Sequence, residues 1–146
     1  MSFSQMMELL QIKEKGRIVI CNAGDFYVAI GKDAILLNKI LGLKVTCFKT
    51  EVCKVGFPIQ SLEKYTELLI KSRYSYIIFY FDKNKRELSI VESCKGKRLN
   101  EETEQKLNCY KCKHNGRYYK KEDMYIEAVK KLYEGGLYKE EVNEDV

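Results

Sequence analysis

Two adjacent aromatic residues follow a turn near the start of the chain. The apolar run from Arg17 to Cys21 predicts a strand, which leads into Asn22-Ala23-Gly24-Asp25-Phe26-Tyr27. A Gly-Asp pair favours a turn, where side chains easily remain outside the core. Proteins that contact DNA use such aromatic side chains as wedges between base steps. Phe26 and Tyr27 are therefore candidate base-stacking residues, and the alternative is that Phe26 packs in a hairpin core.

Two basic clusters have the composition of a phosphate-binding surface. One comprises Lys95, Lys97 and Arg98 on an expected loop, and the other is the run Arg117-Tyr118-Tyr119-Lys120-Lys121. Lys and Arg pair with phosphates while Tyr stacks on bases, so we predict nucleic-acid contacts at Arg117, Lys120 and Lys121 as well. Contact with a protein is an equally good interpretation, since tyrosine is common at protein interfaces.

The cysteines and the single histidine suggest one metal site. Cys94, Cys109, Cys112 and His114 form the candidate set, and Cys109-x-x-Cys112 has the spacing of a zinc loop. His114 follows Cys112 by only two residues, which is unusual, so reduced thiols are the alternative. A zinc ion held by four protein ligands would be structural. The other cysteines (Cys21, Cys47 and Cys53) lie in or near apolar runs and are expected to be small buried hydrophobic residues.

Composition and spacing argue against catalysis and against a membrane protein. The one histidine has no Ser or Asp partner at a recognisable spacing, so we expect a protein that is not an enzyme. The net charge of +5 permits nucleic-acid binding without demonstrating it. No apolar run approaches the roughly 20 residues of a membrane span, and the N-terminus does not look like a secretory signal. A cytoplasmic protein is therefore expected.

Hydrophobic periodicity predicts an α+β domain with a mixed sheet flanked by helices over residues 1–92. Residues 93–146 are interpreted as a basic, cysteine-containing appendage with a terminal helix. Helices are expected from a Ser2–Gln5 capping box to before Gly16, from a cap at Asp33 to Gly42, from a cap at Ser61, and over 122–134. Strands are expected over 17–22, 26–30, 44–49, 52–57, 74–81 and 87–91, with Pro58 interrupting the chain after the fourth.

An ordered set of short sequences resembles the first, mismatch-reading domain of MutS. The set covers residues 1 to about 92 and is stronger evidence than any one member. It comprises Met6-Met7, Gln11-Ile12-Lys13, Gly24-Asp25-Phe26-Tyr27, Asp33-Ala34, Leu41-Gly42-Leu43-Lys44-Val45-Thr46, Gly56-Phe57-Pro58, Ser61-Leu62-Glu63-Lys64-Tyr65 and Tyr74-Ser75-Tyr76-Ile77-Ile78-Phe79.

The resemblance implies that Phe26 stacks on a base and that the acidic residue which accompanies this aromatic residue in the family is missing here. In that family the aromatic residue of a Phe-any-Glu motif stacks on a mispaired base, and the Glu forms a hydrogen bond with that base. Phe26 matches the aromatic residue, but Val28 stands where the Glu would be and offers no acceptor. Such a wedge still stacks on any base. The sequence also holds no Gly-rich Lys-Ser/Thr phosphate loop, so we do not expect it to perform mismatch repair by itself.

The resemblance also implies a partner. Short proteins similar to this MutS domain accompany the reverse transcriptases of diversity-generating retroelements. We therefore expect a non-catalytic accessory protein that binds DNA or RNA and acts with a larger enzyme such as a reverse transcriptase, in a ribonucleoprotein. The alternative is a protein-binding adaptor that retains the MutS-like fold without DNA contact.

Metal analysis of the purified chain tests the zinc interpretation. If the four candidate ligands hold zinc, we expect about one ion per chain, because such sites bind through deprotonated thiols and a neutral imidazole. Cys109→Ser should then lose the ion. A metal-free wild-type protein with freely titrating thiols would show that the cysteines are simply reduced.

Overall fold

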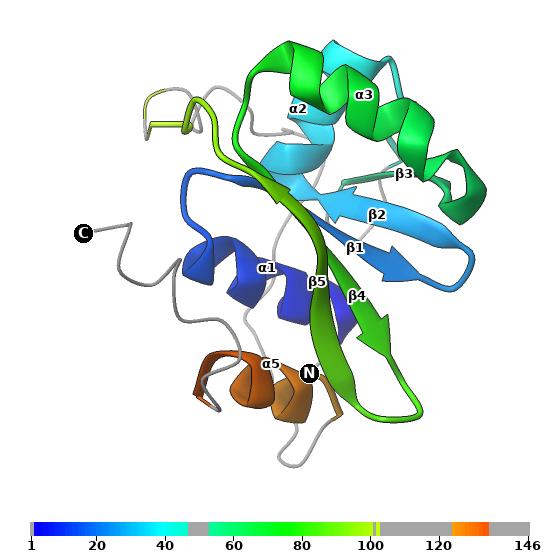
Figure 1. Cartoon of the computed structure of the whole chain (residues 1–146), viewed down its shortest axis with the longest axis vertical. Helices are drawn as coiled ribbons and strands as arrows, with labels where there is room; N and C mark the ends of the chain where they lie inside the picture. The colour runs from blue at the N-terminus through cyan, green and yellow to red at the C-terminus, as the bar shows by residue number, and fades with distance from the viewer. Residues whose placement is uncertain (1, 47–52, 101, 103–123, 135–146) are drawn as a thin grey trace.

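The computed structural model describes residues 2–46, 53–100, 102 and 124–134. In this part of the chain, five strands form one sheet in the order β3-β2-β1-β4-β5 (Figure 1). The strands are β1 (Ile18–Ala23), β2 (Phe26–Ile30), β3 (Lys54–Pro58), β4 (Tyr76–Asp82) and β5 (Glu87–Cys94). The helices are α1 (Phe3–Lys13), α2 (Gly31–Leu41), α3 (Leu62–Ser72) and α5 (Met124–Glu134), with a short 3-10 helix, η1 (Ile59–Ser61).

The sheet is mixed, as the sequence predicts. The central strand β1 pairs antiparallel with β2 and parallel with β4. The outer strands β3 and β5 pair antiparallel with β2 and β4. Helices α1 and α5 cover one face of the sheet, and α2 and α3 cover the other (Figure 1). The predicted α+β class with flanking helices is therefore confirmed.

Two hydrophobic cores lie on the two faces of the sheet because side chains alternate along each strand. In β1, Val19 and Cys21 join the core under α1 and α5, whereas Ile18 and Ile20 join the core under α2 and α3. Burial raises the pKa of the Cys21 thiol to about 12. Cys21 and Cys53 are both buried, as expected for small hydrophobic residues, and Cys47 lies outside the described residues.

Helix α5 belongs to the first of these cores. Its Ala128, Val129 and Leu132 are buried there together with residues of α1 and β5. The expected boundary at residue 92 falls inside β5, which ends at Cys94. No helix among the described residues is long and apolar enough to cross a membrane.

Several local expectations are confirmed and others are wrong. The Ser2–Gln5 capping box is present, and β2 has the predicted bounds. Asp33 does not cap α2, since Ile30 is the N-cap residue. Ser61 is the N-cap residue of α3, as expected, but its side chain makes no capping bond. The strand expected to stop before Pro58 includes Pro58 as its last residue, and η1 follows.

The expected strand 44–49 is only partly within the described residues. There it amounts to one antiparallel bridge between Thr46 and Lys54. Backbone hydrogen bonds of 2.9 Å run in both directions between these two residues. Thr46 therefore lies beside the outer edge of β3.

Asp33 has a different role, because its carboxylate joins three elements inside the protein. Its Oδ2 accepts hydrogen bonds from the Val19 amide at 3.1 Å and from Gln11 Nε2 at 2.9 Å. Lys32 Nζ lies 3.1 Å from Oδ1. Burial raises the pKa of the Asp33 carboxyl above its ordinary value, while these donors act in the opposite direction. Asp33 thus connects α1, β1 and the start of α2.

Asn22 extends the pairing of β1 with β4 beyond its last backbone pair. The parallel register ends at Cys21 and Phe79. The side chain of Asn22 then accepts a hydrogen bond from the Phe81 amide at 2.6 Å and donates one to the Phe81 carbonyl at 3.2 Å. One amide side chain satisfies both backbone groups of a buried residue.

We predict that Asn22→Ala destabilises the protein by about 1–3 kcal/mol, because the amide and carbonyl of Phe81 lose their partner where water has little access. Urea unfolding followed by circular dichroism measures this change. Asn84→Ala is the matched control, since Asn84 is exposed in the β4–β5 turn and its backbone bond to Asp82 does not need the side chain. Equal stabilities of the two variants would contradict the prediction.

Candidate nucleic-acid interface

Phe26 is presented at the β1–β2 turn. Ala23 and Phe26 form the last pair of the hairpin, and Gly24 between them has a φ of +60°, which glycine adopts without strain. Phe26 is the first residue of β2, and 49% of its surface is exposed. An exposed aromatic ring at a turn is the geometry that a stacking wedge requires.

Tyr27 lies on the opposite side of β2 and is only 4% exposed. Its ring packs against Phe57, with centroids 5.8 Å apart, in the core under α2 and α3. Burial raises the pKa of its phenol. A ring in this position has no face open to a base, so Tyr27 does not belong with Phe26 in the interface as the sequence suggested. Strand alternation buries it despite its nearness to the turn.

Phe26 shares a hollow with two lysines that the sequence analysis did not single out. Phe26 and Val28 line a hollow of about 310 Å³ together with Lys44 and Lys54. Both lysines are exposed. They lie 18 and 28 residues after Phe26 in the chain, and only the pairing of β3 with β2 and with Thr46 reveals their position.

The predicted basic loop lies at the other end of the sheet. Its backbone crosses the starts of β1 and β4, where Lys97 bonds to Arg73 and Ser75, and the Leu99 amide donates to the Gly16 carbonyl at 2.9 Å. Phe26 follows the far end of β1. The structure therefore does not bring Lys95, Lys97 and Arg98 together with Phe26.

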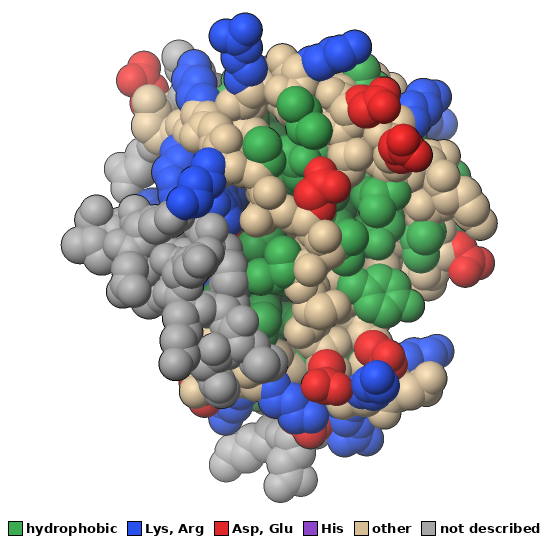
Figure 2. Space-filling model, viewed as in Figure 1, with side chains coloured by type: hydrophobic (Ala, Val, Ile, Leu, Met, Phe, Trp, Pro, Cys, Tyr) green, Lys and Arg blue, Asp and Glu red, His purple; other side chains and the backbone are tan. Residues whose placement is uncertain are grey.

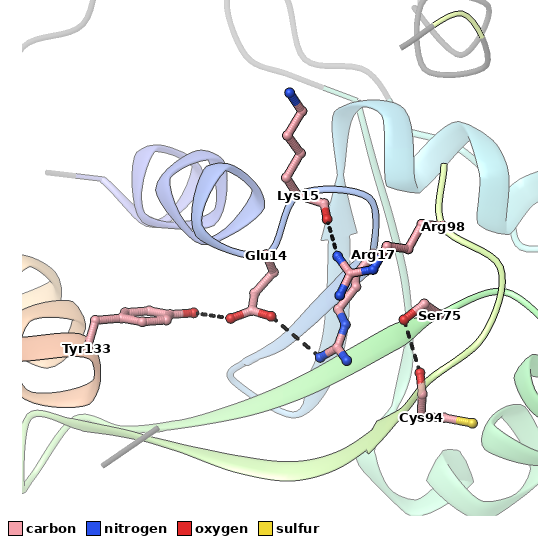
Figure 3. Close-up of polar contacts among 7 residues, drawn as sticks. All are labelled: Glu14, Lys15, Arg17, Ser75, Cys94, Arg98 and Tyr133. Atoms are coloured by element: carbon pink, nitrogen blue, oxygen red, sulfur yellow. Dashed lines mark hydrogen bonds and ion pairs between the residues drawn. The ribbon is translucent and has the colours of Figure 1, made fainter. Parts of the chain in front are cut away.

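Each side chain of this loop has a distinct setting. Lys95 is exposed, and Lys97 Nζ lies 6.0 Å from the centre of the Tyr74 ring. Arg98 is partly buried and donates to the Lys15 carbonyl at 2.8 Å (Figure 3). Figure 2 shows both basic and acidic side chains at the end of the molecule where α2 and α3 lie. The loop thus offers a second basic surface, separate from Phe26.

Cys94 is the one candidate zinc ligand that the structure places. Its carbonyl accepts a hydrogen bond from Ser75 Oγ at 3.2 Å at the end of β5 (Figure 3). Cys109, Cys112 and His114 lie outside the described residues, as do Arg117, Lys120 and Lys121. Within the described ranges no three potential metal ligands come together. The zinc site and the second basic cluster stay predictions.

A buried polar network at the same end was not anticipated from the sequence. Arg17 and Glu14, each 1% exposed, are joined at 3.5 Å. The second oxygen of Glu14 accepts a hydrogen bond from the Tyr133 hydroxyl of α5 at 2.8 Å (Figure 3). The network links the end of α1, the start of β1 and α5, so its role is to hold these elements together.

The mixed five-stranded sheet and the exposed aromatic residue at its first hairpin agree with the resemblance inferred from the sequence. The comparison with protein families agrees, since residues 3–107 match MutS domain I. The chain belongs to this family, and the resemblance inferred from its sequence is confirmed.

The curated relatives that match this chain are named as MutS proteins. The chain is 35% identical over 79 residues to the DNA mismatch repair protein MutS of Thermodesulfovibrio yellowstonii, which covers 50% of this chain and 9% of that protein. It is 36% identical over 73 residues to the DNA mismatch repair protein MutS of Flavobacterium johnsoniae, covering 46% and 8%. These matches thus span less than a tenth of each relative's length.

We predict that Gly96→Ala displaces the basic loop and destabilises the protein by about 1–3 kcal/mol, the usual cost of overpacking. A Cβ atom at Gly96 would lie 2.4 Å from the Arg73 carbonyl oxygen and 3.0 Å from that of Tyr74, both in the backbone. Thermal unfolding measures the loss. Lys95→Ala, one residue earlier and exposed, should change stability little. A Gly96→Ala protein as stable as that control would refute the close contact.

Proposed function

We propose that this chain binds DNA and that Phe26 is the wedge that stacks on a base. The observation that carries the proposal is the exposed ring of Phe26 at the β1–β2 turn of a MutS domain I. Burying such a ring against a base removes apolar surface from water and adds stacking. The curated relatives, which are named as DNA mismatch repair proteins, support DNA as the ligand.

Val28 argues for stacking without selection of the base. Its side chain lies on the same side of β2 as Phe26 and is only 6% exposed. An isopropyl group accepts no hydrogen bond from a base, so contacts at this position cannot distinguish one base edge from another. We therefore propose that the chain recognises exposed base faces and that base identity has little effect on affinity.

Two lysines in the hollow that Phe26 also lines favour nucleic acid over the adaptor alternative, whereas the exposed Asp25 directly before Phe26 carries the opposite charge. A purely protein-binding surface needs no positive charge there, yet Lys44 and Lys54 line the adjoining hollow. Cations beside a stacking ring are the usual combination in proteins that bind single-stranded nucleic acid. The adaptor remains the alternative to be tested, because exposed apolar side chains such as Ile70 and Tyr80 also occur elsewhere.

We further propose that the chain is a non-catalytic accessory protein of a larger enzyme. A reverse transcriptase of a diversity-generating retroelement is the first partner to test, and this choice rests on the sequence resemblance alone. The basic loop with Lys95, Lys97 and Arg98 lies away from Phe26, so a partner bound at this loop would not compete with DNA at the β1–β2 hairpin. Co-purification of the tagged chain with such an enzyme, with and without Lys95→Glu and Lys97→Glu, tests this part separately.

Fluorescence anisotropy with labelled single-stranded and duplex oligonucleotides tests DNA binding. We expect affinity to fall as salt rises, because phosphate contacts release counterions. Phe26→Ala should weaken binding about 5- to 150-fold, the range expected for loss of one stacked base. Phe26→Tyr should retain most of the affinity, since it keeps the ring.

The matched control is Ile12→Ala, which removes an exposed apolar side chain from α1 that is 72% exposed. It should leave affinity unchanged. If Phe26→Ala binds DNA as well as the wild-type protein does, the wedge role is wrong. If the wild-type protein binds no oligonucleotide at low salt, the DNA-binding function itself is wrong.

A further inference from the structure

We propose that the hollow beside Phe26 binds one nucleotide of single-stranded DNA, with the base stacked on Phe26 and the phosphate held between Lys44 and Lys54. This proposal rests on the proposed DNA-binding function and assigns the residues that would complete its site. The site would be formed by side chains of three neighbouring extended segments, whose relative positions follow from strand register.

The first segment is β2, whose alternation sets the side on which Phe26 lies. Tyr27 and Ala29 are buried under α2 and α3, whereas Val28 and Ile30 are buried on the face of α1 and α5. Phe26 therefore starts the row that continues with Val28 and Ile30. Unlike those two residues it is largely exposed, so the open part of this face begins at Phe26.

The second segment is β3, an outer strand with one buried side. Val55 and Phe57 are buried under α2 and α3, and Lys54, Gly56 and Pro58 are exposed on the other side. In the antiparallel register Gly56 lies opposite Val28, and Pro58 lies opposite Phe26. Lys54 and Gly56 consequently share the face of Phe26.

The third segment is the chain from Lys44 to Thr46. Thr46 bridges Lys54, and residues paired in this way project their side chains to the same side of a sheet. Lys44 precedes Thr46 by two residues, so in extended chain it projects to that side too. Lys54 pairs with Ile30, four residues along β2 from Phe26, so Lys44, Thr46 and Lys54 line the end of the hollow that lies away from Phe26.

Together these segments enclose the hollow of about 310 Å³, whose other lining residues are Ala23, Val28 and Val55. Its volume is at the lower end of the range of roughly 300–1,000 Å³ for small-molecule sites. None of the described lining residues is acidic. Gly56 leaves the floor open, because a Cβ there would lie 3.1 Å from the Tyr27 carbonyl oxygen, 3.5 Å from Val28 Cγ2 and 3.8 Å from Phe26 Cβ.

This lining matches the parts of a nucleotide. The Phe26 ring offers a stacking surface, and the two ammonium groups offer opposite charge to one phosphate. The Thr46 hydroxyl is a further hydrogen-bond donor. A base within a duplex is already stacked and paired, and removing it costs a few kcal/mol. The hollow should therefore prefer single-stranded DNA to a perfect duplex.

Anisotropy with labelled oligothymidine of eight nucleotides and with a perfectly paired hairpin tests the site. The double variant Lys44→Gln, Lys54→Gln should weaken oligothymidine binding about tenfold or more, the loss of one or two charge-assisted bonds. The matched control Lys130→Gln plus Lys71→Gln removes the same charge from exposed positions on α5 and α3. It should cost much less.

Gly56→Val is a second, charge-neutral variant that fills the hollow and leaves both lysines in place. It should weaken oligothymidine binding to a similar degree, and β-branched residues suit a strand. In the wild-type protein, backbone NMR signals of Lys44, Thr46, Lys54 and Gly56 should shift on addition of oligothymidine. Circular dichroism checks that each variant is folded.

The outcomes separate this site from the proposed function. If Phe26→Ala abolishes binding but the lysine pair and Gly56→Val behave like the controls, DNA binding stands and the nucleotide site is wrong. The nucleotide site is also wrong if the protein binds the DNA hairpin and oligothymidine equally well. If the wild-type protein binds neither oligonucleotide, both proposals are overturned.

Discussion

The register of β2 between β1 and β3 is the constraint on which the candidate interface depends. Tyr27 pairs with Asn22 on one side and with Phe57 on the other. This register places alternate residues of β2 in two different cores. A slip by one residue would exchange the two faces, burying Phe26 and exposing Tyr27. The exposure of one ring is therefore maintained by the burial of its neighbours on both faces of the sheet.

Buried polar groups hold the helices that cover this sheet. The pair Glu14–Arg17 joins the end of α1 to β1 and binds α5 through Tyr133. Breaking a buried ion pair from one side costs about 3–5 kcal/mol, far more than an exposed pair contributes. Asp33 and Gln11 act similarly between α1 and α2. The hydrogen bond between Gln11 and Asp33 gives a physical reason why two of the short sequences that resemble MutS, one with Gln11 and one with Asp33, occur together.

The sequence predicts the inner elements well because their patterns are strong. The apolar runs of β4 and β2 predicted strands close to those observed, and the ordered resemblance predicted the correct family. The role of Asp33 was predicted wrongly because the sequence does not distinguish an Asp that caps a helix from a buried Asp that accepts hydrogen bonds from other elements. Lys44 and Lys54 were missed because nothing local marks them. They share a hollow with Phe26 only because Thr46 bridges Lys54 and β3 pairs with β2.

The same topology separates the two basic surfaces. Phe26 lies beyond the end of β1, and the loop with Lys97 crosses its start, so the six residues of β1 place them roughly 20 Å apart. Both ends belong to one sheet with a core on each face, which makes their spacing fixed. A ligand held at the hairpin is therefore presented at a constant distance from whatever contacts the loop. The proposed role beside a larger enzyme would require such a constant spacing between the DNA and the partner.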